Sequence, residues 1–278
     1  MGVKVDIEKA VSLYKSKGGK IQFEDDLKKI LKYAENDNRI NDFRELAYLL
    51  ASAEVESSYS LSRWESDYVC KDSSGNRMTG RSYLGKLPDN KPCKSALDYY
   101  RSSSGKSNYY LKGTDSRGLP YFGRGLIQIT HPENYKKRGQ NIGLGDALYN
   151  DPDLIMKNPK ISYDASVDFL ITGKGSNKLS TFDLVKQGDL VGARRWVNGC
   201  SREKCKPEAE ISYNKWLSVL NDSQVKAKKT VGVSPQESNK NIGKGGSGKG
   251  YKALGFGIIF LSVVGFAYGL YYFTRTKK

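Results

Sequence analysis

The segment from Tyr121 to Tyr135 constrains the fold more than any other part of the chain, because two glycines flank an arginine within it. It reads Y-F-G-R-G-L-I-Q-I-T-H-P-E-N-Y. Glycines in this pattern suit a turn that needs positive φ angles or a close backbone approach. The residues after the second glycine alternate over a run too short for a helix, which predicts a half-buried extended segment. Leu126, Gln128 and Thr130 would then point to one side.

This segment resembles the G-R-G-x-I-Q-[LI]-[ST] signature of glycoside hydrolase family 19, which includes chitinases and phage endolysins. The resemblance continues in residues 150–154, which read N-D-P-D-L where the family has an N-P-D-L turn. Upstream it reaches residues 51–54 (A-S-A-E), and downstream it reaches residues 196–199 (W-V-N-G). It implies a mainly α-helical, lysozyme-like catalytic domain with two lobes and little β structure.

Apolar spacing predicts the helices of this domain. The first covers residues 5–17, the second covers residues 23–34, and the third begins at Asp42 with Glu45 as its capping partner. Later helices are expected at 133–141, 161–172, 181–197 and 208–220. Residues 57–120 are irregular and rich in Ser, Gly, Lys and Tyr, and an irregular stretch of this length usually carries function.

The C-terminal part of the chain contains an apolar run from Ala253 to Phe273 without a charged residue, bounded by Lys252 and Arg275. A run of about 20 apolar residues spans the hydrocarbon layer of a bilayer, so a transmembrane helix is predicted here. Gly265 and Gly269 form a G-x-x-x-G pair, which favours a weak homodimer through this helix.

Four regions are therefore expected. Residues 1–221 form the catalytic domain, 222–252 a flexible basic linker rich in Gly, Ser and Lys, 253–273 the transmembrane helix, and 274–278 a basic tail. This organisation predicts a single-pass membrane protein with a C-terminal anchor, in a virion internal membrane or a host cell membrane.

The chain carries a net charge of +16. A basic surface attracts anionic polymers, and the bacterial cell wall is one such polymer. Nucleic acid is another, but we expect no nucleic-acid partner. The sequence has no nucleic-acid-binding motif, and its basic residues are not interleaved with aromatics as in a strand-binding groove.

The cysteines are Cys70, Cys93, Cys200 and Cys205. The local pairing, Cys70 with Cys93 and Cys200 with Cys205, is preferred among the three that four cysteines allow. Free buried thiols are the alternative. Because there is no C-x-x-C pair and His131 is the sole histidine, we expect neither a metal site nor a cofactor.

Hydrolysis of a glycosidic bond needs a carboxylic acid that protonates the leaving oxygen. Glu54 lies at the C-terminal end of the third predicted helix, where a half-buried carboxyl beside a cleft can stay protonated. The resemblance implies the same role, since Glu54 matches the general acid of the family's S-H-E-T motif. Here that motif reads S-A-E-V, without the histidine and the final threonine.

The second carboxylate of the reaction has several candidates. Glu65 is preferred because it follows Trp64 at the start of the irregular region, on a segment separate from Glu54. Glu56 is the first competitor, but it lies two positions from Glu54 and is expected to point elsewhere on a continuous helix. Asp67 and Asp72 are the remaining candidates.

The resemblance also implies roles for polar side chains. Thr130 matches the residue that positions the attacking water, and a positioned water implies the inverting mechanism. Gln128, Asn134 and Asn198 match sugar-binding amides, which can both donate to and accept from hydroxyl and N-acetyl groups. Arg124 is interpreted as a structural link between loops.

The main functional hypothesis is a membrane-anchored hydrolase that cleaves the β-1,4 bonds of peptidoglycan, associated with a phage or virion and acting in lysis or entry. Chitin is the alternative substrate, because both polymers contain N-acetylglucosamine. A second class of hypothesis is a catalytically inactive protein that binds the wall and retains the fold.

Overall fold

Helix α3 (Phe43–Ser57) lies at the centre of the fold in the computed structural model, which describes residues 2–64, 74, 112–173, 178–200, 205 and 208–225. Every residue of α3 from Glu45 to Ala53 is buried. The Asp42 side chain caps its start by accepting a hydrogen bond from the Arg44 amide at 2.7 Å. The predicted capping partner Glu45 instead accepts from the Asn41 amide, at 3.0 Å.

On one side, α3 packs against a group formed by both ends of the folded unit. This group consists of α1 (Ile7–Ser16), α2 (Glu24–Glu35) and α13 (Glu208–Asp222). The two ends are joined where the Asp6 amide donates to the Ser223 carbonyl at 2.8 Å. Long α13 contacts α3 along much of its length, which fixes the direction of the central helix.

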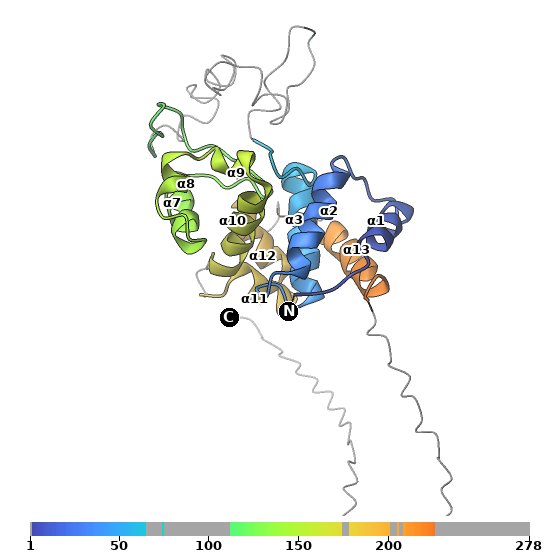
Figure 1. Cartoon of the computed structure of the whole chain (residues 1–278). Helices are drawn as coiled ribbons and strands as arrows, with labels where there is room; N and C mark the ends of the chain where they lie inside the picture. The colour runs from blue at the N-terminus through green and yellow to red at the C-terminus, as the bar shows by residue number, and fades with distance from the viewer. Residues whose placement is uncertain are drawn as a thin grey trace, which may run out of the picture. The chain divides into compact units, whose positions relative to one another are not determined.

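A second group of helices follows the irregular region, and Figure 1 draws it in green and yellow apart from the blue N-terminal helices. It contains α7 (Pro132–Asn141), α8 (Ala147–Asn150), α9 (Leu154–Lys157) and α10 (Pro159–Thr172). Two further helices, α11 (Thr181–Lys186) and α12 (Leu190–Asn198), follow α10, and α11 contacts α10, α12 and α3.

The prediction of a mainly helical domain is confirmed, because the described residues contain isolated β-bridges but no regular strand. The prediction of one helix over 181–197 is wrong. Gly188 adopts a φ of 81° and ends the first helix, and the Asp189 side chain caps the next by accepting from the Gly192 amide at 2.9 Å. The four-residue helices α8 and α9 were not predicted, because one turn carries no periodicity.

The central segment does not form the expected extended strand. The chain turns at Gly125, whose φ is 77° and where an added Cβ would lie 2.2 Å from Ile155 Cγ2. Leu126 is fully buried, and its amide donates to Ser162 Oγ on α10 at 3.0 Å. The prediction that Leu126 shares a side with Gln128 and Thr130 is therefore wrong, because a turn replaces the two-residue alternation.

Residues 1–228 form one compact unit, and residues 229–278 are grouped separately from it. Among the helices of the described residues, none is long and apolar enough to cross a membrane. The apolar run 253–273 and almost all of the predicted linker lie outside the described residues, so the transmembrane helix and its homodimer stay predictions.

Candidate active site

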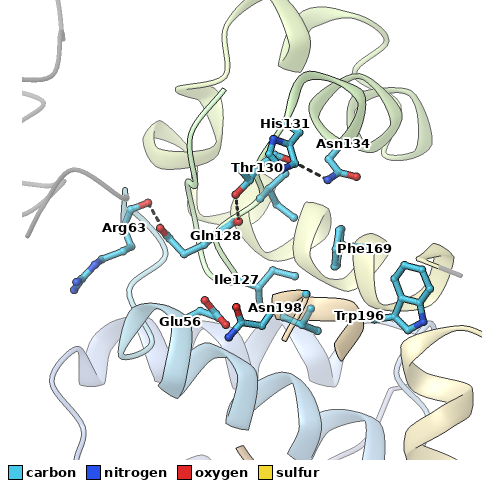
Figure 2. Close-up of a pocket in the computed structure, with 13 residues that line it drawn as sticks. Glu56, Arg63, Ile127, Gln128, Thr130, His131, Asn134, Phe169, Trp196 and Asn198 are labelled. Carbon is cyan, nitrogen blue, oxygen red and sulfur yellow. Dashed lines mark hydrogen bonds between the residues drawn. The ribbon is translucent and has the colours of Figure 1, made fainter. Parts of the chain in front are cut away.

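A cavity of about 520 Å³ opens where the two groups of helices meet. It is enclosed by the end of α3, by residues 123–131 (the central turn), by the start of α7, by α10 and by the end of α12 (Figure 2). The polar residues that line it are Glu56, Arg63, Gln128, Thr130, His131, Asn134 and Asn198. The cavity therefore gathers all four polar residues that the sequence assigned to water and sugar binding.

The side chains of the central turn are held by its own backbone. Thr130 Oγ1 donates to the Gln128 carbonyl at 2.8 Å, so the hydroxyl oxygen keeps lone pairs that can accept a hydrogen bond from water. Asn134 Nδ2 donates to the Thr130 carbonyl at 2.8 Å, and Gln128 Nε2 donates to the Gly125 carbonyl at 2.9 Å. Because both amide nitrogens donate to backbone carbonyls, the two amide side chains are held in fixed positions in the cavity wall.

Two residues of this turn have a backbone conformation that side chains disfavour. Gln128 has a φ of 56° and His131 has a φ of 74°. Such conformations cost roughly 1–3 kcal/mol each and persist where the surroundings impose them, often at functional sites. The strain here lies in the wall of the cavity, next to Thr130.

Arg124 lies beneath the turn and is completely buried. Its Nε donates to Asp153 Oδ1 at 2.8 Å, and its guanidinium carbon lies 3.6 Å from the centroid of the Phe122 ring. Burial alone would raise the pKa of Asp153, but Arg124 and Arg117 outweigh it and hold this pKa below its ordinary value. The interpretation of Arg124 as a structural link is confirmed.

Glu56, on the last turn of α3, is the carboxylate that faces the cavity among the described residues. Its Oε1 accepts from Arg194 on α12 at 2.6 Å. The Arg194 side chain is only 7% exposed and that of Glu56 is 19% exposed, so the pair is largely shielded from bulk water. Arg194 therefore holds Glu56 in a defined position at the edge of the cavity.

Glu54 does not face the cavity, contrary to the expectation from the sequence. Its Oε2 accepts hydrogen bonds from the hydroxyls of Tyr14 on α1 and Ser212 on α13. Residues two positions apart on an α-helix are separated by about 200° around its axis, so Glu54 and Glu56 point to opposite sides. The expectation that Glu54 lies beside the cleft, and that Glu56 points elsewhere, is corrected by the partners of the two carboxylates.

The other candidate carboxylates, Glu65, Asp67 and Asp72, lie outside the described residues, as do Cys70 and Cys93. The predicted Cys200–Cys205 disulfide is present, with Cα atoms 5.3 Å apart. It follows Asn198 and Gly199 directly and closes the chain just after the cavity wall. Within the described part of the chain, no three His, Cys, Asp or Glu side chains are grouped to hold a metal ion.

Sequence reasoning missed three features of this site. It gave no role to Arg194, it placed Glu56 on the wrong side, and it did not identify the aromatic side chains of Phe169 and Trp196 in the cavity wall. The N-terminal cap at Asp189 could have given the phase of α12, and hence placed Arg194 and Asn198 four residues apart on one face.

Comparison with known proteins finds that a part of this chain is similar to proteins named endochitinases. The acidic 26 kDa endochitinase of Solanum lycopersicum is 43% identical over 65 residues, covering 23% of this chain and 25% of that protein. An endochitinase of Pisum sativum is 41% identical over 68 residues, covering 24% of this chain and 20% of that protein. The aligned segment thus spans about a quarter or less of these relatives.

Solved structures of bacterial chitinases are similar over a longer range. Chitinase C from Streptomyces griseus covers 79% of this chain and 94% of its own at 16% identity, with a TM-score of 0.49. A bacterial family 19 chitinase covers 77% of this chain and 84% of its own at 16% identity, with a TM-score of 0.40. Residues 92–191 match the glycoside hydrolase family 19 model, described as chitinase class I. The chain thus contains a segment similar to that family's domain, and this segment supplies the central turn, Asn134 and Phe169 of the cavity.

Proposed function

We propose that the chain is a glycoside hydrolase that cleaves β-1,4-linked polymers of N-acetylglucosamine, with Glu56 as the general acid. The observation that carries this proposal is the position of Glu56, which faces the same cavity as Thr130, Gln128, Asn134 and Asn198. A carboxyl opposite a hydroxyl and several amides is the arrangement that glycoside hydrolysis needs. The similarity of residues 92–191 to family 19 chitinases supports the same reaction class.

In this scheme Glu56 donates its proton to the glycosidic oxygen as the bond to the anomeric carbon breaks. Arg194 keeps the carboxyl in place from α12. Thr130 accepts a hydrogen bond from the attacking water, while its own hydroxyl donates a hydrogen bond to the Gln128 carbonyl. A second carboxylate removes the proton of that water, and we assign this role to Glu65, which follows Trp64 in the chain. Attack by a positioned water inverts the anomeric configuration.

Chitin-type polymers are the preferred substrate class, because the matched relatives are named endochitinases. Peptidoglycan is the second candidate, favoured by the net charge of +16, since its peptide carboxylates make it anionic whereas chitin is neutral. Residues 253–273 would keep either activity at a membrane surface, of a virion or of a host cell.

The full-length protein should be incubated separately with chitotetraose and with purified peptidoglycan, and proton NMR should follow the first products. We expect α-anomeric reducing ends from the β-linked substrate, with faster release from chitotetraose. A β-anomer as the first product would contradict the water-attack scheme. Binding of both glycans without any release of reducing ends would favour an inactive wall-binding protein.

The anchor is tested by alkaline extraction of membranes. We expect full-length protein to remain in the membrane pellet, and a chain that ends at Gly250 to be released while it keeps its activity. Full-length protein that washes off at high pH would contradict a transmembrane helix.

A further inference from the structure

Trp196 is the one tryptophan of this chain that is exposed. The sequence contains three, and Trp64 and Trp216 are 1% and 0% exposed, whereas Trp196 is 37% exposed and forms part of the cavity wall. Leaving a large aromatic surface in water forgoes the gain from its burial, roughly 1.5–3 kcal/mol for a large apolar side chain. An exposed indole inside a cavity therefore points to a ligand that covers it.

The helix that carries Trp196 is secured at both ends. The Asp189 side chain caps its start, and Gly199, with a φ of 65°, ends it immediately before the Cys200–Cys205 disulfide. Arg194 on this helix is tied to Glu56 across the cavity edge. A rigid support keeps the indole in one place, so a ligand that stacks on it loses little additional entropy.

The surroundings of Trp196 combine apolar and polar groups. Figure 2 draws Trp196 and Phe169 at one end of the cavity, with Arg63 and Gln128 at the other. Asn198 lies two residues after Trp196 and also lines the cavity. A β-linked pyranose ring matches this combination, because its axial C–H groups form an apolar face while its hydroxyl and N-acetyl groups project from the rim.

We propose that Trp196 and Phe169 form a sugar subsite in which the indole stacks on the apolar face of one N-acetylhexosamine ring of a longer glycan. The substrate class rests on the proposed function. The subsite binds a sugar away from the bond that Glu56 cleaves, and so it increases the affinity for oligosaccharides relative to single sugars. Pockets lined by aromatic groups with a few oriented polar groups are typical of such recognition.

The exposure of a single tryptophan allows a direct test by fluorescence. Acrylamide should quench mainly Trp196 in the full-length protein, because Trp64 and Trp216 are buried. We expect chitotetraose to lower the Stern–Volmer constant at least about twofold, and N-acetylglucosamine to do so far less. The measurement uses the Glu56→Gln variant, which leaves the sugar chain intact if Glu56 is the acid.

Variants separate stacking from structure. Trp196→Ala should raise the dissociation constant of chitotetraose about tenfold, as expected for loss of an aromatic contact worth about 1.4 kcal/mol, and Trp196→Tyr should recover part of it. Ile211→Ala is the matched control, because Ile211 is an exposed apolar residue of α13, 59% exposed, that does not line the cavity. In an otherwise wild-type chain, Trp196→Ala should raise KM with little change in kcat.

The outcomes distinguish the subsite from the proposed function. Protection of Trp196 by chitotetraose, together with no hydrolysis of chitotetraose by the wild-type chain, supports the subsite and contradicts the function. Hydrolysis with an unchanged quenching constant and an unchanged KM for Trp196→Ala overturns the subsite. A quenching constant that falls as the protein concentration rises, without sugar, also overturns the subsite. It would mean that a second copy of the chain covers Trp196.

Discussion

The two sides of α3 each carry a glutamate, and they use it differently. Glu54 faces the interior, where its Oε2 accepts from Tyr14 and Ser212 and links α1 and α13 to the central helix. Glu56 faces the cavity, with Arg194 as its partner and the turn residues of the second helix group across the space. Chemically identical groups two positions apart therefore hold the fold together on one side and line a cavity on the other.

The interior side surrounds Glu54 with aromatic and hydrogen-bonding partners. Tyr14 stacks on Trp216 with ring centroids 3.9 Å apart, and Trp216 Nε1 donates to the Tyr59 hydroxyl at 3.0 Å. The Tyr14 hydroxyl in turn donates to Glu54. Two donors hold the half-buried carboxylate of Glu54 in place, which makes Glu54 a structural residue. The cavity side instead places polar side chains along an open space.

The largest expected effect is on catalysis. Glu56→Gln should reduce the rate of chitotetraose hydrolysis about 100- to 10,000-fold, because an amide cannot supply the proton to the leaving oxygen. Glu54→Gln is the matched control on the other side of the helix, and it should keep at least about a tenth of the activity. Reducing-end release by purified variants with wild-type circular dichroism measures both.

A reversed result would break the comparison. If Glu54→Gln is inactive while Glu56→Gln hydrolyses normally, the acid is the residue that the family motif suggested, and the cavity-facing glutamate has another role.

Thr130 should give the next largest effect. Thr130→Ala removes the hydroxyl that accepts from the attacking water, and loss of one such hydrogen bond costs about 1–3 kcal/mol, or roughly 5- to 150-fold in kcat. KM should change little, because the water is not part of the bound sugar. Thr130→Ser keeps the hydroxyl and should restore most of the rate. A Thr130→Ala enzyme with normal kcat and raised KM would identify Thr130 as a sugar-binding residue only.

The sequence predicted local features of this molecule well. It did not predict on which side of α3 Glu54 and Glu56 each lie. Strong periodicity predicted α2, and Gln128, Thr130, Asn134 and Asn198 all reach one cavity because they flank turns or helix ends. The phase of α3 was not predictable in this way. Its residues from Glu45 to Ala53 are buried all round, so no polar stripe showed which glutamate faces outwards.

Tertiary contacts determine which side of α3 each glutamate faces. The side of Glu54 is set by Tyr14, 40 residues earlier, and Ser212, 158 residues later, and the side of Glu56 by Arg194. No local pattern records such partners. The letters S-A-E matched the family motif two positions before the glutamate that faces the cavity.

The two glutamate substitutions should affect stability in the opposite order to their effect on activity. Glu54→Gln weakens two charge-assisted hydrogen bonds in the interior and should lower the free energy of unfolding by about 1–2 kcal/mol. Glu56→Gln should lower it by less than about 1 kcal/mol, because the amide oxygen still accepts from Arg194 at the edge of the cavity. Urea denaturation of both variants measures the difference. Equal losses would mean that the two sides of α3 do not differ in structural role.

The smallest effect concerns pH. Burial, and then the hydrogen bond to Glu54, raise the pKa of Tyr14 well above its ordinary value of 10.0. The folded state therefore keeps the proton of Tyr14 at pH values where the unfolded chain releases it. The stabilisation from this proton is complete below about pH 10 and is lost as the pH rises beyond it. Lys215, whose Nζ lies 5.3 Å from the centroid of the Tyr14 ring, is the cation that faces this group.

Tyr14→Phe should be less stable than the wild type at pH 7, because Glu54 loses a donor. Above pH 10 the gap should narrow, since the wild type releases one more proton on unfolding than the variant. Urea denaturation at pH 7, 9 and 10.5 measures this gap, and a gap that stays constant or widens would contradict a protonated Tyr14 behind the helix that carries Glu56.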